Sequence, residues 1–175
     1  MGSADVKVKP FSLIAVGGTF DRLHRGHKEL LRTAFKVGEK VIIGLTSDEM
    51  VARTKGNASI SKFEDRKKGL EEWIEKEGLA KEADHEIVLI NDVYGTAIYD
   101  NRLEALVVSE ETYQRAITIN KIRIERGLKP LIIIVMPMVL ARDGKPISST
   151  RIRRGEIDEE GELLLKSVKA NLRSP

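Results

Sequence analysis

The fold of this chain is decided by the stretch Gly17-Gly18-Thr19-Phe20-Asp21-Arg22-Leu23-His24-Arg25-Gly26-His27. An apolar run over residues 11–16 precedes it and indicates a buried strand, whereas the residues that follow have helical spacing. The stretch is therefore predicted to be a loop that joins a strand to a helix. Because open α/β sheets bind their ligands in such loops, we expect a binding site here.

Glycines and polar groups in this loop suit an anionic ligand. Gly17 and Gly18 are expected to let the backbone turn tightly and approach a ligand closely. Thr19 and Asp21 supply polar groups, and Phe20 lies between them. The free N–H groups and the positive end of the following helix add to the attraction for phosphate. These features predict a site for a polyphosphate.

Two histidines stand at the start of the predicted helix. His24 and His27 are three residues apart, so they lie on one face, and Gly26 between them leaves room for a close approach. A single histidine at such a place is more often a cap or a surface residue than a catalytic one. Zinc binding is a second alternative, but the chain has no cysteine and the third histidine, His85, is far along the sequence. We therefore predict no metal site built from side chains.

Length and composition set further bounds. The 175 residues are enough for one domain with a substantial core, and the lack of cysteine excludes disulfides and thiol chemistry. No apolar run is long enough for a transmembrane helix, and residues 1–10 lack the apolar core of a signal peptide. The net charge of +3 is too small to indicate nucleic-acid binding. We expect a cytoplasmic protein with small anionic ligands and no membrane or nucleic-acid partner.

Strand and helix patterns alternate along the chain. The predicted strands cover residues 11–16, 40–45, 85–90, 106–108 and 131–136. The last is continuously apolar, which is typical of a parallel strand covered on both faces. The alternation predicts an α/β fold, a Rossmann-like five-stranded parallel sheet with helices on both faces. We expect a single domain over residues 1–175, with a polar lead-in at 1–10 and a C-terminal helical extension at 156–175.

A basic, glycine-containing segment, residues 53–57, follows the second predicted strand and is expected to be a loop. Alone it would be interpreted as a solvated turn. Because the loops after parallel strands emerge at one edge of the sheet, Lys55 can reach the pocket of the two histidines. Arg53 is the alternative residue for this role. Arg66, on the next predicted helix, is open between a surface ion pair and a phosphate contact.

A second anion site is predicted at residues 147–153, Ile-Ser-Ser-Thr-Arg-Ile-Arg. The hydroxyls of Ser148, Ser149 and Thr150 stand at the start of a predicted helix, where side-chain and backbone donors face an anion. Arg153 adds a positive charge with the fork geometry that fits phosphate. The ordinary alternative is a serine helix cap followed by surface arginines.

The two motifs carry a family resemblance. T-F-D-x-x-H-x-G-H and I-S-S-T-x-x-R, about 120 residues apart, resemble the signatures of the nucleotidylyltransferase superfamily, which is related to class I aminoacyl-tRNA synthetases. Nearly the whole chain resembles the archaeal type of phosphopantetheine adenylyltransferase, through residues 17–27, 93–95, 107–112, 127–131 and 139–158. The bacterial type has threonine at the position of His24 and an arginine after the fourth strand. Bacterial substrate contacts and the bacterial hexamer are therefore not carried over.

The resemblance implies that AMP is transferred from ATP to 4′-phosphopantetheine, which gives dephospho-CoA and pyrophosphate in coenzyme A biosynthesis. It implies Mg²⁺ bound through the ATP phosphates and catalytic roles for His24, His27, Lys55 and Arg153. The other predicted binding residues are Gly17, Gly18, Thr19, Phe20, Asp21, Gly26, Ser109, Glu110, Ser148, Ser149 and Thr150.

Two functional alternatives stay open. The first is another nucleotidylyltransferase that uses nicotinamide mononucleotide, FMN or a cytidylyl donor, since the two phosphate motifs would be the same. The second is a non-catalytic nucleotide-binding protein. The expected oligomeric state is a monomer or a small homo-oligomer.

Overall fold

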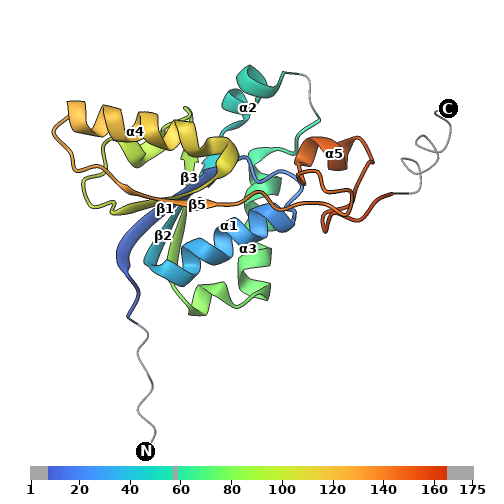
Figure 1. Cartoon of the computed structure of the whole chain (residues 1–175), viewed down its shortest axis with the longest axis horizontal. Helices are drawn as coiled ribbons and strands as arrows, with labels where there is room; N and C mark the ends of the chain where they lie inside the picture. Colours follow the sequence, from blue (N-terminus) through green and yellow to red (C-terminus); the bar gives the residue numbers. More distant parts are fainter. Residues whose placement is uncertain (1–7, 57–58, 165–175) are drawn as a thin grey trace, which may run out of the picture.

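Five parallel strands form one sheet in the computed structural model, which describes residues 8–56 and 59–164 (Figure 1). The order across the sheet is β3-β2-β1-β4-β5. The bounds are β1 Phe11–Gly18, β2 Gly38–Thr46, β3 Asp84–Ile90, β4 Ala105–Ser109 and β5 Ile132–Met136. Each neighbouring pair is parallel, which confirms the predicted sheet. The order reverses between β1 and β4, and such a switch point is where open α/β sheets bind ligands.

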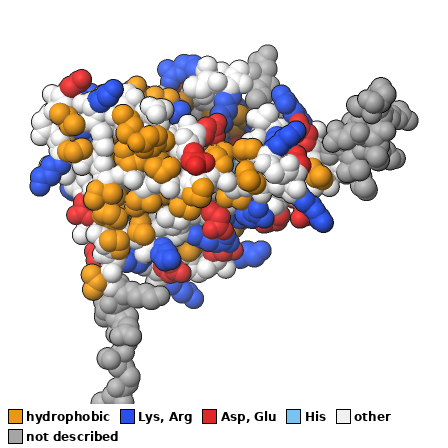
Figure 2. All heavy atoms as spheres, in the orientation of Figure 1, with side chains coloured by type: hydrophobic (Ala, Val, Ile, Leu, Met, Phe, Trp, Pro, Cys, Tyr) orange, Lys and Arg blue, Asp and Glu red, His pale blue; other side chains and the backbone are white. Residues whose placement is uncertain are grey.

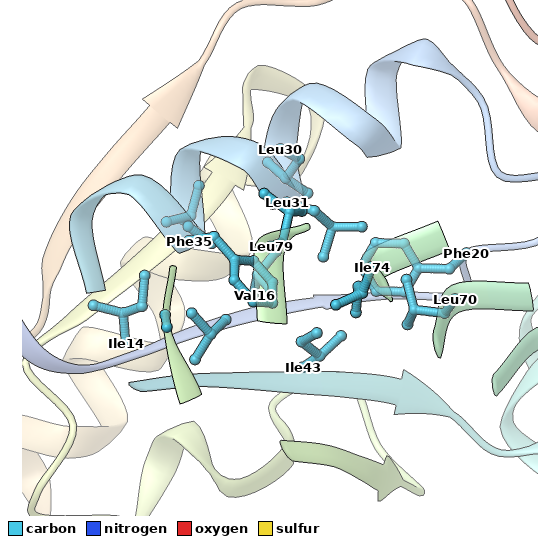
Figure 3. Packing of buried hydrophobic residues seen from close by; sticks show 14 of the residues in the cluster. Ile14, Val16, Phe20, Leu30, Leu31, Phe35, Ile43, Leu70, Ile74 and Leu79 are labelled. Atoms are coloured by element: carbon cyan, nitrogen blue, oxygen red, sulfur yellow. The ribbon is translucent and has the colours of Figure 1, made fainter. Parts of the chain in front are cut away.

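Helices cover both faces of the sheet, as predicted (Figure 1). The bounds are α1 Arg25–Val37, α2 Asp48–Lys55, α3 Phe63–Lys76, α4 Tyr113–Glu125 and α5 Ser149–Arg153, with 3₁₀ turns η1 Leu79–Lys81, η2 Gly95–Ile98 and η3 Glu110–Thr112. Ile14 and Val16 of β1 pack with α1 and α3 (Figure 3), whereas Leu13 and Ala15 pack with η2 and α4. Since successive strand side chains point to opposite faces, β1 contributes to both cores.

Helix α1 is anchored by one apolar stripe. Leu30, Leu31, Ala34 and Phe35 are buried, and they have the helical spacing that the sequence predicts. Each large apolar side chain that is fully buried in this way stabilises the fold by about 1.5–3 kcal/mol. The helix begins directly after His24, so this packing fixes the two histidines relative to the end of β1.

Strand β5 differs from its prediction, because it lies at an edge of the sheet. Ile132 is 57% exposed and Val135 is 40% exposed, so the strand is not covered on both faces. Apolar side chains accordingly gather over β5 and α4 on the face shown in Figure 2. The continuous apolar run predicted the strand correctly and its coverage wrongly.

The predicted C-terminal helix is absent from residues 156–164, which form turns and an isolated antiparallel bridge between Ile157 and Leu163. Ile157 is fully buried against Ala141 and Ile147 in a small cluster beside α5. The rest of this prediction, residues 165–175, and residues 1–7 of the polar lead-in lie outside the described residues. Across residues 8–56 and 59–164, no helix combines the length and apolarity that crossing a bilayer requires.

Candidate functional site

A cavity of about 500 Å³ opens at the carboxyl ends of β1 and β4, beside the switch point of the sheet. Both predicted motifs reach it, although they are far apart in the chain. Its walls include the predicted residues Gly17, Gly18, Thr19, Phe20, His24, Gly26, His27, Lys55, Ser109, Ser148, Ser149, Thr150 and Arg153. Two predicted binding residues, Asp21 and Glu110, do not line it.

The turn after β1 is not made by its glycines. Gly17 and Gly18 end the extended strand, so the prediction that they form the turn is wrong. Phe20 and Arg22 instead adopt left-handed backbone angles, with φ of 49° and 48°. This conformation costs a residue with a side chain about 1–2 kcal/mol, and such strain is concentrated at ligand sites. Gly17 and Gly18 line the cavity with backbone alone.

The two histidines form a stacked pair. Their ring centroids lie 3.8 Å apart, and the ring of Phe20 packs edge-on against His27 with centroids 5.3 Å apart. A Cβ at Gly26 would lie 3.1 Å from two atoms of the His24 ring, so only glycine leaves that ring undisturbed. The Nδ1 atoms of both histidines are buried without a hydrogen-bond partner among the described residues. The pair is thus held by packing rather than by hydrogen bonds of these two ring nitrogens.

Both histidines are neutral at pH 7. Burial is the main cause that lowers the pKa of His24, to about 4, and the charge of Lys28 adds to it. Burial also holds the pKa of His27 well below its usual range, and its neighbours His24 and Lys55 lower it further when they are protonated. A neutral imidazole can donate one hydrogen bond to a phosphate oxygen without adding a proton to the site.

This depressed pKa predicts a pH-dependent stability. Between pH 6.5 and 4 the unfolded state binds a proton at His24 that the folded state excludes, so stability falls as the pH falls through this window. At pH 5 the loss from this ring is about 2 kcal/mol relative to pH 7. Urea unfolding at the two pH values measures it. His24→Asn should flatten the dependence, whereas His85→Asn should not; equal slopes in all three proteins would contradict the assignment.

Asp21 joins the two motifs rather than lining the cavity. Its carboxylate is 1% exposed, accepts a hydrogen bond from the Ser61 backbone N–H and pairs with Arg153 at 2.7 Å. Its backbone carbonyl accepts a 2.6 Å hydrogen bond from the hydroxyl of Ser149. A second nitrogen of Arg153 donates to the hydroxyl of Thr150. Asp21 thereby sets the direction in which the Arg153 guanidinium faces the cavity.

The three hydroxyls of the second motif have different contacts. Ser148 caps α5 by accepting from the Arg151 backbone N–H, and Thr150 accepts from Arg153. Each of these two hydroxyls therefore retains its hydrogen for a ligand, whereas Ser149 donates its hydrogen to Asp21. Of the three predicted hydroxyls, two can donate a hydrogen bond to a ligand, whereas the third connects the second motif to Asp21.

The structure distinguishes Lys55 from Arg53, the two candidates for a cation in the cavity. They lie in the last turn of α2, so the predicted loop at residues 53–57 is wrong for 53–55; Asn57 lies outside the described residues. Lys55 lines the cavity, whereas Arg53 turns away and donates to the carbonyl of Asn91 at 2.6 Å. Desolvation lowers the pKa of the Lys55 ammonium and Arg153 lowers it further, opposed by acidic neighbours.

Arg66 does form an ion pair, but it is buried rather than on the surface and does not line the cavity. Its guanidinium is buried and donates to the backbone carbonyls of Thr19, Thr46 and Ser61, and it pairs with Asp48 at 3.1 Å. These bonds tie the first-motif loop to the ends of β2 and to α3. Arg66 therefore supports the floor of the site from behind.

Several cavity residues were not among the predicted site residues, although sequence reasoning placed the loops at 91–96 and 109–112 on the ligand side of the sheet. Glu110 accepts a hydrogen bond from the Met138 backbone N–H, and its neighbour Glu111 lines the cavity instead. Further lining residues include Glu29, Tyr94, Gly95, Thr96, Ala97, Thr112, Arg115 and residues 136–139. Their position in the sequence could have indicated a place in the cavity, because residues 94–97, 111–115 and 136–139 lie at or after the carboxyl end of a strand. Within the described ranges, no group of three or more His, Asp or Glu side chains could hold a metal ion.

Sequence comparisons agree with this geometry. A family model described as cytidylyltransferase-like matches residues 15–155. A phosphopantetheine adenylyltransferase of Methanothermobacter thermautotrophicus is 50% identical over 165 residues, which cover 94% of this chain and 96% of the relative. Another, from Pyrococcus horikoshii, is 49% identical and covers 88% and 96%. A bifunctional phosphopantetheine adenylyltransferase/NTP phosphatase of Thermoplasma volcanium is 48% identical over 90% of this chain and 46% of its own length.

Solved structures show the same fold. A protein of unknown function from Archaeoglobus fulgidus is 36% identical and superposes with a TM-score of 0.61 over 72% of this chain and 89% of that one. A tyrosyl-tRNA synthetase from the same organism has a TM-score of 0.55 at 12% identity, over 82% and 60% of the two chains. The second likeness concerns the fold alone. By the family model and the sequence relatives, the chain belongs to the cytidylyltransferase-like family and, within it, to the phosphopantetheine adenylyltransferases.

Proposed function

We propose that the cavity joins ATP and 4′-phosphopantetheine and transfers AMP between them. The observation that supports this most directly is the convergence of neutral histidines, Lys55 and the paired Arg153 on one cavity. The cavity is large enough for a nucleotide and part of a second ligand, since ligand pockets span roughly 300–1,000 Å³.

The proposed reaction needs positioning more than acid–base chemistry. The phosphate of 4′-phosphopantetheine attacks the α-phosphorus of ATP, a new P–O bond forms, and the bond to pyrophosphate breaks. A phosphate monoester has a second pKa near 6 and is largely dianionic at pH 7, so no general base is required. The protein must bring two mutually repelling anions together and stabilise the charge on the phosphate oxygens.

We assign the roles as follows. Thr19 orients the attacking phosphate, and the neutral His24 and His27 donate to oxygens near the α-phosphate. Arg153 contributes positive charge, and Lys55 reaches the phosphates from α2. Ser148 and Thr150, which retain donor hydrogens, hold the β- and γ-phosphates, and residues 109–112 face the nucleoside.

Mg²⁺ fits this site as a companion of ATP. The described residues offer no cluster of three acidic or histidine side chains, so triphosphate oxygens would be its main ligands. Glu29 and Glu111 are acidic residues that line the cavity, and Glu111 interacts with Lys55. When bound, the ion neutralises phosphate charge. The cytoplasmic location and a monomer or small homo-oligomer stay predictions.

An acceptor panel tests the function. Purified protein with ATP and Mg²⁺ is offered 4′-phosphopantetheine, nicotinamide mononucleotide or FMN, and glycerol 3-phosphate is offered with CTP. Pyrophosphate release is measured in each case. We expect kcat/KM for 4′-phosphopantetheine to exceed the others by about 100-fold or more, because a site built to bind one acceptor leaves polar groups unpaired with another. Comparable values for a second acceptor, or no pyrophosphate from any of them, would refute the proposal.

Lys55→Ala should lower kcat by about tenfold, with less than a threefold change in the Kd for ATP. The reason is that a mobile ammonium adds most where charge density peaks, around the α-phosphate. Single-turnover rates and calorimetric ATP binding measure the two quantities. Arg53→Ala is the matched control and should react at the wild-type rate, because Arg53 bonds to Asn91 outside the cavity. A normal rate for Lys55→Ala with a slow Arg53→Ala would move the role to Arg53.

A further inference from the structure

One wall of the cavity is built from irregular backbone. Residues 91–104 connect β3 to β4, which lie on opposite sides of β1 and β2 in the sheet. Within this connection, residues 94–97 line the cavity and include most of η2. Asp92 fixes the start of the wall, since its carboxylate accepts from the backbone N–H groups of Tyr94 and Gly95. The wall is not part of the sheet ladder, so its position depends on other contacts.

The far end of this wall is held by α4. Arg123 donates from Nη1 to the carbonyl oxygens of Ala97 at 2.6 Å and Asp100 at 2.9 Å. Arg126 donates to the carbonyl of Ile98 at 3.2 Å. The last carbonyls of a short helix have no partner within it, and cationic donors are the favourable ones at that end. Arg123 therefore acts as a side-chain cap on η2.

Arg123 is fully buried, with 0% of its surface exposed. Its Nε also donates to the carbonyl of Lys129 at 2.8 Å, so one guanidinium joins the cavity wall, α4 and the connection to β5. Its Nη2 is buried with no partner among the described residues. A buried charge is unfavourable compared with an apolar residue of similar size. Core stability alone therefore does not account for an arginine here, whereas the fixed position of three carbonyls does.

The wall lies on the acceptor side of the site in the proposed function. The sheet order puts the histidine loop, after β1, in the middle of the cavity. The second motif and residues 136–139 lie toward β5, and residues 109–112, proposed to face the nucleoside, follow β4. Residues 94–97 follow β3 on the other side, together with apolar lining from Ile42 and Ile90. That side is left for the long, largely uncharged arm of the acceptor.

We propose that Arg123 is a positioning residue that sets the affinity of the site for the acceptor by holding residues 94–97 in place. It touches neither substrate and acts from behind the wall. The acceptor half of this inference rests on the proposed function, whereas the positioning of the wall does not.

The test compares Arg123→Gln, Arg123→Lys and Lys121→Gln. Arg123→Gln removes the bonds to Ala97, Asp100 and Lys129, and it should raise KM for 4′-phosphopantetheine by about tenfold or more. KM for ATP should change by less than about twofold and kcat by less than about threefold. Arg123→Lys keeps a cationic donor and should have an intermediate KM. Lys121→Gln, on an exposed side chain of the same helix that does not line the cavity, is the control and should match the wild type. Equal increases in both KM values would overturn the inference.

A measurement without ligand tests the positioning of the wall separately from the effect on acceptor binding. Amide hydrogen exchange of a peptide covering residues 94–101 should be faster in Arg123→Gln, whereas peptides from β1 should be unchanged. Should Arg123→Gln fail to fold, Arg123→Lys is measured in the same way. Unchanged exchange in the folded variant would refute the positioning role. If the wild type shows no adenylyl transfer, the proposed function fails, and the exchange result still decides the role of Arg123.

Discussion

Replacing His27 with alanine is expected to lower kcat by about 100- to 1,000-fold while the Kd for ATP changes by less than about threefold. The ring is held between the stacked His24 and the edge of Phe20, so its donor is oriented before the substrates arrive. A donor that is already aimed at developing charge acts mainly in the transition state. Single-turnover rates and calorimetric ATP binding measure the two effects separately.

The matched control for this variant is His85→Ala. His85 lies in β3 and packs against Phe35, with ring centroids 5.5 Å apart, away from the cavity. It should cost stability and leave kcat within about twofold, because only packing is lost. A His27→Ala enzyme that reacts within threefold of the wild-type rate would rule out the catalytic role of this ring.

Asp21→Asn is expected to lower kcat by about 10- to 100-fold and the free energy of unfolding by about 1–3 kcal/mol. The amide keeps the volume of the carboxylate but leaves Arg153 without its buried counter-charge, so the guanidinium is no longer held toward the cavity. The stability loss is placed below the usual range for a broken buried pair because Arg153 is partly exposed. Urea unfolding and steady-state pyrophosphate release measure the two losses.

A second ion pair that involves an arginine of α5 provides the control. Asp143 pairs with Arg151 near α5, and neither side chain lines the cavity. Asp143→Asn should therefore lower stability without changing kcat beyond about twofold. If both variants lose stability equally and neither loses activity, Asp21 has no part in aiming Arg153.

The order and type of the main elements could be predicted because their signals are local. The alternation of strand and helix patterns gave the parallel sheet, and the apolar stripe of α1 was visible in its spacing. The order of the strands across the sheet could not be predicted, because the sequence of a connection does not determine which strands become neighbours. The apolar run of β5 was therefore assigned two covered faces, although the strand lies at an edge. The helix expected over 156–164 failed because Ile157 is buried in a cluster of turns.

In the site, the residues that face the cavity were easier to predict than those that hold them. His24, His27, Lys55 and Arg153 are reactive types in loops or helix ends that follow strands, and the structure brings them to one cavity. Asp21 and Arg66 could not be assigned correctly from sequence, because a buried charge is defined by partners that lie tens of residues away. The turn was credited to glycines, because a phenylalanine with positive φ has no sequence signature.

The contacts of Asp21 with Ser149 and Arg153 join residues 128 and 132 positions apart in the chain, and this has a consequence for synthesis on the ribosome. A nascent chain that ends at Pro137 already contains all five strands of the sheet. It lacks α5, so the Arg153 guanidinium that pairs with Asp21 at the cavity has not yet been made. The order of translation therefore leaves the proposed phosphate site without its second motif until after the sheet is complete, and we expect a product truncated at this point to bind ATP more weakly than the whole chain.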